Sequence, residues 1–402
     1  MVGRNDPLIE RINAFWEDFV DAPYERQWAL VTEILAEEPE LFDGEMVFEI
    51  TNTLFDRAVE AGEIERYKRL LDQLEESVPE AYAEELSYIL EWRIQIALIE
   101  GNKADVERYF YQFSPLAGEH LDTYYRAVSA LAYHGHQEIL YQGMRQARPY
   151  VAEGADLAEW AYGEFTEKLG DLEILHLLDK NPDLMPDDST LQQHFAEYEL
   201  TIVPEGFATV LDYRTGRKLP SWTPADFEFT KGKKKDPAKD NLAYLLATFT
   251  RYAHVEEGIS RTKVEMARDE LSRYFLLRHQ GELGKPGTQA SRKKRSRKQK
   301  SGKSMSQHPL CPDAKTLDRY LGQRMGFMSF RYHEAFALYE LIPAWLRFLT
   351  KYRLLDEDTR QKTVKELGYL KEHLIRFADN NLYNPVMKDN LVDWPYETAK
   401  QS

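Results

Sequence analysis

Residues 86–115 read LSYILEWRIQIALIEGNKADVERYFYQFSP, and this stretch decides the fold. Apolar residues recur three or four positions apart on both sides of a glycine: Leu86, Ile89, Leu90, Ile94 and Ala97 precede Gly101, and Val106, Tyr109, Phe110 and Phe113 follow it. This spacing is the signature of amphipathic helices. Because glycine readily takes the left-handed conformation that ends a helix and proline cannot continue one, the stretch predicts a helix–turn–helix unit that ends at Pro115.

The same pair of glycine and proline recurs along the first 182 residues. Gly101 and Pro115 are followed 34 residues later by Gly135 and Pro149, and then by Gly170 and Pro182; Gly62 and Pro79 precede them. A period near 34 is typical of helical hairpins that cannot bury their apolar faces alone and stack on their neighbours. We therefore expect about five helix pairs over residues 5–182, with turns at Gly62, Gly101, Gly135 and Gly170.

This stretch resembles the tetratricopeptide-like family of α-solenoids. Residues near the positions that the family uses are Ala97, Gly101, Tyr109, Phe113 and Pro115 in one unit, and Leu131, Gly135, Ala147 and Pro149 in the next. The resemblance implies stacked helix pairs that present a binding groove. HEAT-like and irregular helical repeats are the alternatives.

The remainder of the chain predicts four further regions. Residues 183–240 form an irregular insert with a short helix near 191–202, and alternation about Thr215 and Gly216 indicates either a small hairpin or a loop packed on the solenoid. Residues 241–281 predict a helical pair, 282–309 a basic disordered linker, and 310–402 a C-terminal helical segment in which Pro343 kinks or splits one helix. The predicted fold class is all-α: a solenoid, an insert and a smaller C-terminal bundle.

The charge of the chain is divided between its halves. The net charge of −16 comes from 15 basic and 43 acidic residues in 1–200 against 37 basic and 25 acidic residues in 201–402. Such asymmetry indicates different partners for the halves, contact between them, or a well-solvated acidic face. An acidic groove in the first half would suit a basic or mixed peptide surface of another protein.

A second candidate site is basic. Seven cationic residues crowd positions 291–300, and a lysine loop precedes them; the candidate polyanion-binding residues are Arg292, Lys293, Lys294, Arg295, Arg297, Lys298 and Lys300, with Lys233, Lys234 and Lys235. Lysine and arginine bind phosphates by releasing counterions, so this tract predicts salt-dependent binding to nucleic acid. The alternatives are a solvated linker and an arm that docks on the acidic half of the same chain.

Two tyrosines are candidates for partner binding. Tyr111 falls off the apolar stripe of its helix, and Tyr124 opens the following unit, so we expect both to face the groove. Tyrosine is a favoured anchor in protein interfaces.

The motifs that would indicate a metal site, a phosphate-binding loop or a catalytic site are weak. Glu173 and His176 form a single Glu-x-x-His, His308 and Cys311 offer two ligands where structural zinc needs four, and His134 and His136 flank a turn. In the phosphate-loop-like segment 281–288 proline follows the lysine. We therefore expect no metal, no cofactor and no enzyme activity, although a catalytic site across the insert stays an alternative.

The composition indicates a cytoplasmic protein. No run of 18 apolar residues is present, the first residues lack the apolar stretch of a secretory signal, and Cys311 is the single cysteine. The sequence therefore predicts a non-catalytic scaffold or adaptor with an acidic groove. The alternative is a nucleic-acid-associated or regulatory protein that uses the basic tract 291–300. In a variant of this alternative, the acidic half of the same chain binds the tract and inhibits the protein.

Overall fold

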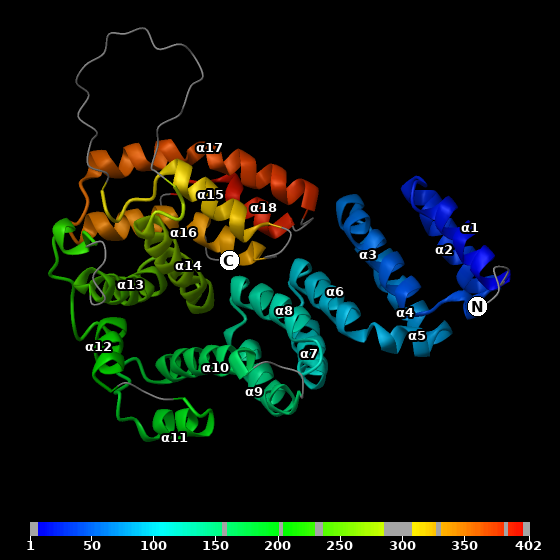
Figure 1. The fold of residues 1–402 in the computed structure, drawn as a ribbon, viewed down its shortest axis with the longest axis horizontal. Coiled ribbons are helices and arrows are strands. Elements are labelled where there is room, and N and C mark those ends of the chain that lie inside the picture. The colour runs from blue at the N-terminus through cyan, green and yellow to red at the C-terminus, as the bar shows by residue number, and fades with distance from the viewer. Residues whose placement is uncertain are drawn as a thin grey trace, which may run out of the picture. The chain divides into compact units, whose positions relative to one another are not determined.

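The computed structural model describes residues 7–154, 159–200, 204–229, 236–284, 308–326, 331–381 and 385–396. Within these residues the fold is helical throughout, as predicted, with eighteen α-helices, three 3₁₀ turns and no strand (Figure 1). The chain divides into two compact units: unit 1 holds residues 1–127 and 380–384, and unit 2 holds residues 128–379 and 385–402. The boundary at 182 expected from the repeat pattern therefore lies inside unit 2.

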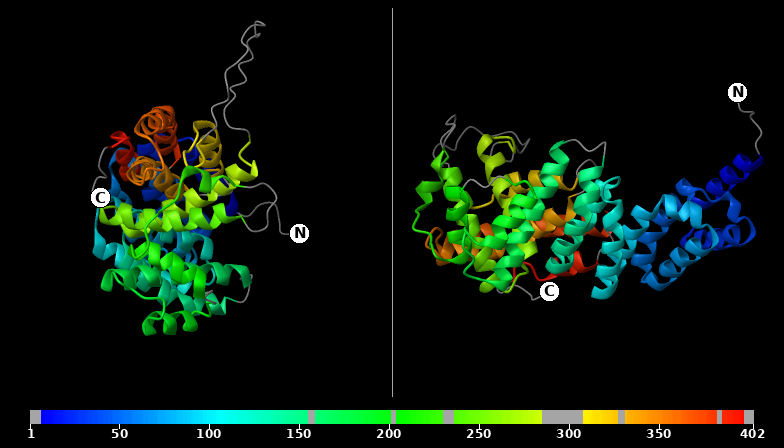
Figure 2. Two further views of the ribbon diagram at one scale, coloured as in Figure 1. Left: turned by 90° about the vertical axis from the view of Figure 1, so that its left-hand side faces the viewer. Right: turned by 90° about the horizontal axis from the view of Figure 1, so that it is seen from below.

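Unit 1 consists of helices that follow one another in chain order (Figure 2). They are α1 (Pro7–Phe19), α2 (Tyr24–Glu37), η1 (Pro39–Leu41), α3 (Gly44–Ala61), α4 (Ile64–Ser77), α5 (Pro79–Glu84), α6 (Leu86–Ile99), α7 (Lys103–Phe113), η2 (Ser114–Leu116) and most of α8 (Leu121–Tyr133). Gly62 ends α3 and Gly101 lies between α6 and α7, both with positive φ, which glycine adopts without steric cost. The predicted turns at these two glycines are confirmed.

One apolar cluster runs through the hairpins of unit 1. Val31, Val47, Ile50, Leu71 and Ile89 are fully buried in it and come from α2, α3, α4 and α6. These residues lie on the apolar stripes of successive helices. Burial of each aliphatic side chain contributes about 1.5–3 kcal/mol, so neighbouring hairpins stabilise one another.

Unit 2 begins at Val128 within α8 and contains the longer helices. They are α9 (Gln137–Glu153), α10 (Glu159–Lys180), α11 (Ser189–Glu197), α12 (Pro204–Thr215), η3 (Pro224–Phe227), α13 (Pro237–Val255), α14 (Arg261–Gln280), α15 (Ala314–Arg324), α16 (Tyr332–Lys351), α17 (Glu357–Asn381) and α18 (Pro385–Val392). Helix α16 is buried along most of its length, and Pro343 lies inside it without splitting it. Trp394 stacks on Tyr339 with ring centroids 4.6 Å apart, so the segment that follows α18 packs on α16.

The predicted turn at Gly170 is wrong. Helix α10 runs through this residue from Glu159 to Lys180. A Cβ added at Gly170 would lie 2.4 Å from the Leu200 side chain and 3.7 Å from Phe195. The glycine therefore permits close packing against the α11 region, and the fifth predicted helix pair is one continuous helix.

The segment before Gly216 is neither the small hairpin nor the loop that its alternation indicated, because helix α12 covers Pro204–Thr215. The segment contains helical spacing as well as alternation: Phe207 and Leu211, four positions apart, join the cluster under α10 and α11. Tyr213 stacks on Tyr244 of α13, with centroids 5.3 Å apart. Tertiary packing on two neighbouring helices thus decides a pattern that the sequence leaves ambiguous. Gly216, with φ +81°, follows the helix end.

Candidate functional site

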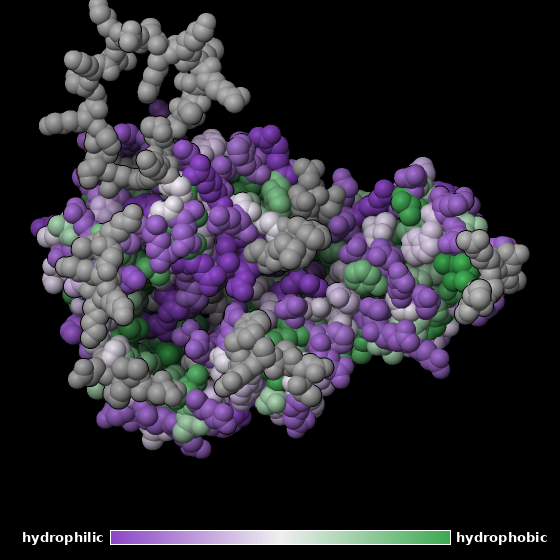
Figure 3. All heavy atoms as spheres, viewed as in Figure 1, coloured by the Kyte–Doolittle hydropathy of each residue, from purple (hydrophilic) through white to green (hydrophobic). Residues whose placement is uncertain are grey.

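The candidate site is a cleft of about 270 Å³ within unit 2, between α10 and α14. Hydrophilic residues gather around a hollow on this face of unit 2 (Figure 3). Its wall from α10 consists of Glu164, Glu167, Lys168, Asp171, Leu172 and Leu175. Its wall from α14 consists of Thr262, Glu265, Met266, Asp269, Glu270 and Arg273, and Ala132, Leu140, Arg331 and Glu334 complete the lining.

Both walls follow helical geometry. The lining positions of α10 and those of α14 are each separated alternately by three residues and by one, which places them on a single face of the helix. The face on α10 spans positions 164–175 and exists only because the helix continues through Gly170. Gly170, which lies inside α10, therefore helps to form this wall of the cleft.

The lining is acidic at its exposed edge and partly apolar inside. Seven carboxylates and three cationic side chains line the cleft. The Glu164 and Asp171 side chains are each 49% exposed and that of Asp269 is 59% exposed. Glu164 lies 3.7 Å from Arg331, and Asp171 and Asp269 lie 3.6 Å and 2.6 Å from Arg268, so the negative charge of the rim is partly balanced within the chain. The buried apolar lining residues are Ala132, Leu140, Leu172, Leu175 and Met266. The cleft therefore combines an anionic rim with apolar side chains behind it.

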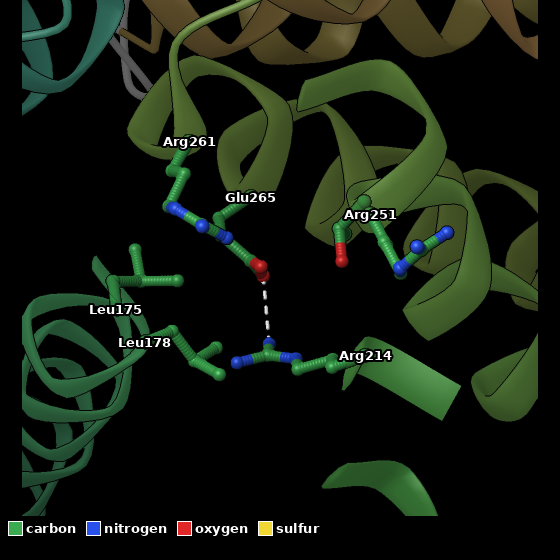
Figure 4. Close-up of a pocket in the computed structure, with 7 residues that line it drawn as sticks. Leu175, Leu178, Arg214, Arg251, Arg261 and Glu265 are labelled. Atoms are coloured by element: carbon green, nitrogen blue, oxygen red, sulfur yellow. Dashed lines mark hydrogen bonds and ion pairs between the residues drawn. The ribbon is translucent and has the colours of Figure 1, made fainter. Parts of the chain in front are cut away.

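Glu265 is paired inside the protein. Arg214 of α12 donates to its Oε2 atom at 2.8 Å, and Arg268 lies 2.8 Å from the same oxygen. Burial raises the pKa of the Glu265 carboxyl, and the two arginines oppose that increase. Figure 4 shows the Arg214 guanidinium pointing at Glu265, whereas that of Arg251 points away from it. Glu265 thus joins α12 to α14.

Glu270 is also paired, whereas Glu334 is paired at one oxygen only. Tyr320 donates to Glu270 Oε2 at 2.5 Å and Arg324 to Oε1 at 2.7 Å. Glu334, only 8% exposed, accepts a hydrogen bond from Ser129 at Oε1 at 2.8 Å. Its Oε2 atom is buried and has no hydrogen-bond partner among the described residues. Glu265 and Glu270 are paired with arginines, whereas the Oε2 atom of Glu334 could still accept a hydrogen bond.

A buried polar network lies beside Glu334 on α8, α14 and α16. Lys263 forms an ion pair with Glu340 at 2.5 Å and lies 4.0 Å from the centre of the Tyr133 ring, and the Tyr133 hydroxyl donates to Glu340. Burial lowers the pKa of His134 to about 3 and that of His333 to about 4. Both imidazoles are therefore uncharged at neutral pH, and neither gives Glu334 a positive charge.

The predicted partner-binding tyrosines do not line this cleft. Tyr124 is fully buried in unit 1, where it stacks on Phe110 with centroids 5.1 Å apart and contacts Phe113 edge-on. The prediction that Tyr124 faces a groove is therefore wrong, because its side chain packs in the core of unit 1 against these two phenylalanines. Tyr111 is half-buried on α7, and its binding role stays a prediction.

The candidate polyanion-binding residues lie outside the described part of the chain. This holds for the whole 291–300 tract, from Arg292, Lys293, Lys294 and Arg295 to Arg297, Lys298 and Lys300, and for Lys233, Lys234 and Lys235. Their role in binding nucleic acid stays a prediction from sequence.

The histidine and cysteine pairs weighed for metal binding have other partners. Glu173 accepts from the Tyr141 and Tyr198 hydroxyls, whereas His176 lies 2.8 Å from Glu138. His308 contacts the Leu354 carbonyl at 2.8 Å, and burial raises the pKa of the Cys311 thiol to about 12. Within the described residues no group of three or more histidine, cysteine or acidic side chains is placed to hold a metal ion.

The cleft residues are absent from the sequence-based candidates for a specific reason. Placing a turn at Gly170 separates Glu164 and Glu167 from Asp171, so their common helical face is lost. A sequence signal was present in the spacing of three and four between these carboxylates, beside the apolar stripe of the same helix. The pairing of α10 with α14 is a contact between distant segments and has no local signal.

Comparison with known proteins adds no relative: no family model, no curated protein and no solved structure matches the chain. The tetratricopeptide-like resemblance therefore stays a prediction. Among the described helices, none combines the length and apolar character needed to cross a membrane.

Proposed function

We propose that this protein is a non-catalytic protein-binding module that receives a basic segment of a partner in the α10–α14 cleft. The observation that carries the proposal is the cleft itself, with an exposed acidic rim and apolar side chains behind it. This cleft differs from the groove expected from the helix repeats of the first half, because α14 forms its second wall.

The charges of the rim suit a cationic partner. Exposed carboxylates attract opposite charge over about 8 Å at physiological ionic strength and accelerate encounter more than they strengthen the complex. Affinity would come from the interior, where Leu172, Leu175 and Met266 can pack against the methylene groups of a lysine or arginine. The rim thus favours a basic segment, and the apolar lining favours its long side chains.

The size of the cleft fits this class of partner. A volume of about 270 Å³ is slightly smaller than the roughly 300–1,000 Å³ that hold drug-sized ligands and cofactors. It suits one or two side chains of a polypeptide that lies across the rim.

Fluorescence anisotropy with labelled decapeptides tests the proposal. We expect an alternating lysine–serine peptide to bind and its glutamate–serine counterpart not to bind. The double variant Glu164→Lys/Glu167→Lys should weaken binding at least tenfold, because it reverses two charges on the rim. A matched control is Glu76→Lys/Glu80→Lys, which makes the same charge change at exposed positions of unit 1 and should alter affinity less than twofold.

Equal losses in both double variants would show that net charge, and not the cleft, attracts the peptide, and would refute the proposal. A wild-type protein that ignores the lysine peptide but binds a DNA duplex would refute it as well. That second result would instead support the nucleic-acid function predicted from residues 291–300.

A further inference from the structure

Glu334 stands out among the residues that line the cleft. It is the first-turn carboxylate of α16, it is only 8% exposed, and its Oε2 atom is buried without a hydrogen-bond partner among the described residues. We infer that Glu334 is the receptor for the ammonium group of a single lysine in the bound segment. This inference rests on the proposed function and adds a specificity residue to it.

The energetic reason is the open oxygen. A buried acceptor without a donor is unfavourable, and the penalty is larger for a charged group than for a neutral one. An ammonium group that reaches Oε2 would supply both a donor and the opposite charge, which makes a charge-assisted hydrogen bond.

Neighbouring cations are engaged elsewhere. Lys263 forms a buried ion pair with Glu340, at 2.5 Å. The Arg331 guanidinium, three positions before Glu334, lies 3.7 Å from Glu164. These two side chains therefore do not pair with Glu334 Oε2, and Oε2 has no hydrogen-bond donor among the described residues.

The geometry favours lysine over arginine. Ser129 occupies Oε1, so Glu334 presents one oxygen where a guanidinium fork would use two. An ammonium group is a compact charge that one oxygen can accept. The buried Leu140, Leu172 and Met266 side chains in the same lining suit its unbranched methylene stem.

Peptide variants test the inference on the unaltered protein. In the lysine–serine decapeptide, each lysine is replaced in turn by arginine and by acetyl-lysine. We expect one position at which either replacement weakens binding at least tenfold, whereas the other positions change affinity less than threefold. Uniform small effects along the peptide would overturn the inference and leave the proposed function intact.

The protein variant Glu334→Gln supplies the second arm, because it keeps the shape of the side chain and an acceptor for Ser129 but removes the charge. We expect at least tenfold weaker binding of the parent peptide, and no further loss when the critical lysine is acetylated. Glu76→Gln, which removes one carboxylate at an exposed position of unit 1, is the matched control and should cost less than twofold. Thermal unfolding identifies a misfolded variant, in which case the peptide series alone decides.

A third arm distinguishes a peptide lysine from a free amine. The same ammonium chemistry is available in 1,5-diaminopentane, which is added as a competitor of the labelled peptide. We expect displacement only at concentrations well above the dissociation constant of the peptide. Displacement at lower concentrations would refute the assignment of the ammonium group to a peptide lysine and would identify a small amine as the ligand of Glu334.

Discussion

The two compact units differ in how far apart in the sequence their contacting side chains lie. In unit 1 the side-chain contacts between helices join near neighbours: Arg66 reaches Glu25 across 41 residues and Arg126 reaches Glu91 across 35. In unit 2 Ser129 reaches Glu334 across 205 residues, and Asn390 reaches Tyr133 across 257. Unit 1 is therefore organised as successive hairpins, and unit 2 is closed by its last helices.

Unit 2 contains an ion pair that is far more buried than the Arg66–Glu25 pair of unit 1. The Arg66–Glu25 side chains of unit 1 are 32% and 70% exposed, whereas those of Lys263 and Glu340 in unit 2 are 5% and 3% exposed. Exposed pairs contribute about 0–1 kcal/mol, but loss of one partner from a buried pair costs about 3–5 kcal/mol. Stability should therefore depend on the Lys263–Glu340 pair far more than on the Arg66–Glu25 pair.

Substitution of Lys263 should have the largest effect on the free energy of unfolding. Lys263→Met leaves Glu340 buried without its countercharge, and we expect a loss of about 3–5 kcal/mol in the free energy of unfolding of unit 2. Lys68→Ala, which removes the exposed pairs with Glu65 and Glu100 in unit 1, should cost less than about 1 kcal/mol. Urea unfolding followed by hydrogen exchange on peptides of each unit measures both values.

A double variant controls for a change in side-chain shape. Lys263→Met combined with Glu340→Leu removes both charges and should recover most of the lost stability, because an apolar pair can replace a buried ion pair. If the double variant is as unstable as Lys263→Met, packing and not charge explains the effect, and the contrast between the units weakens.

Acid should change the stability contributions of two buried histidines in unit 2 and of a buried aspartate in unit 1 in opposite directions. Burial lowers the pKa values of His134 and His333 below the ordinary 6.5, so the stability they give unit 2 is present above pH 6.5 and is lost toward pH 4 as the unfolded chain binds protons. Burial raises the pKa of Asp56 in unit 1 to about 6, so its contribution is most favourable below pH 3.8 and is lost as pH rises through 6.

Two variants isolate these contributions. Asp56→Asn should stabilise unit 1 by about 1–2 kcal/mol at pH 7 and by almost nothing at pH 4. His333→Gln should remove about 1–2 kcal/mol of the acid sensitivity of unit 2 between pH 7 and pH 5. Hydrogen exchange at each pH provides the measurement, and parallel pH profiles for wild type and variant would contradict the assignment.

Gly170 gives a smaller effect that tests the continuity of α10. In a double-mutant cycle, Gly170→Ala should cost about 1 kcal/mol when Leu200 is present and should become neutral or favourable with Leu200→Ala, since the added Cβ competes with that side chain. Gly163→Ala, in the same helix with open space around it, should stabilise by about 0.5–1 kcal/mol. A cost at Gly170 that is independent of Leu200 would argue for a backbone role.

The difference between the units also explains what the sequence could predict. Apolar spacing and the positive-φ glycines Gly62 and Gly101 identify the hairpins of unit 1 because the responsible contacts lie within one or two helices. In unit 2 the same glycine signal misleads at Gly170, where a distant side chain and not a turn requires the small residue. Ser129 and Glu334 are separated by 205 residues, so no local pattern indicates their contact, although the spacing of the α10 carboxylates marks one wall of the cleft.

The smallest expected effect concerns Tyr111, which the sequence placed on a binding groove. Tyr111→Ala alters a half-buried side chain of unit 1 and should leave the affinity for the lysine–serine peptide unchanged within twofold, since the α10–α14 cleft belongs to unit 2. Anisotropy titrations of Tyr111→Ala and of Glu167→Lys in parallel make the comparison direct. A greater loss for Tyr111→Ala than for Glu167→Lys would move the binding surface to α7 and restore the groove expected from the repeats.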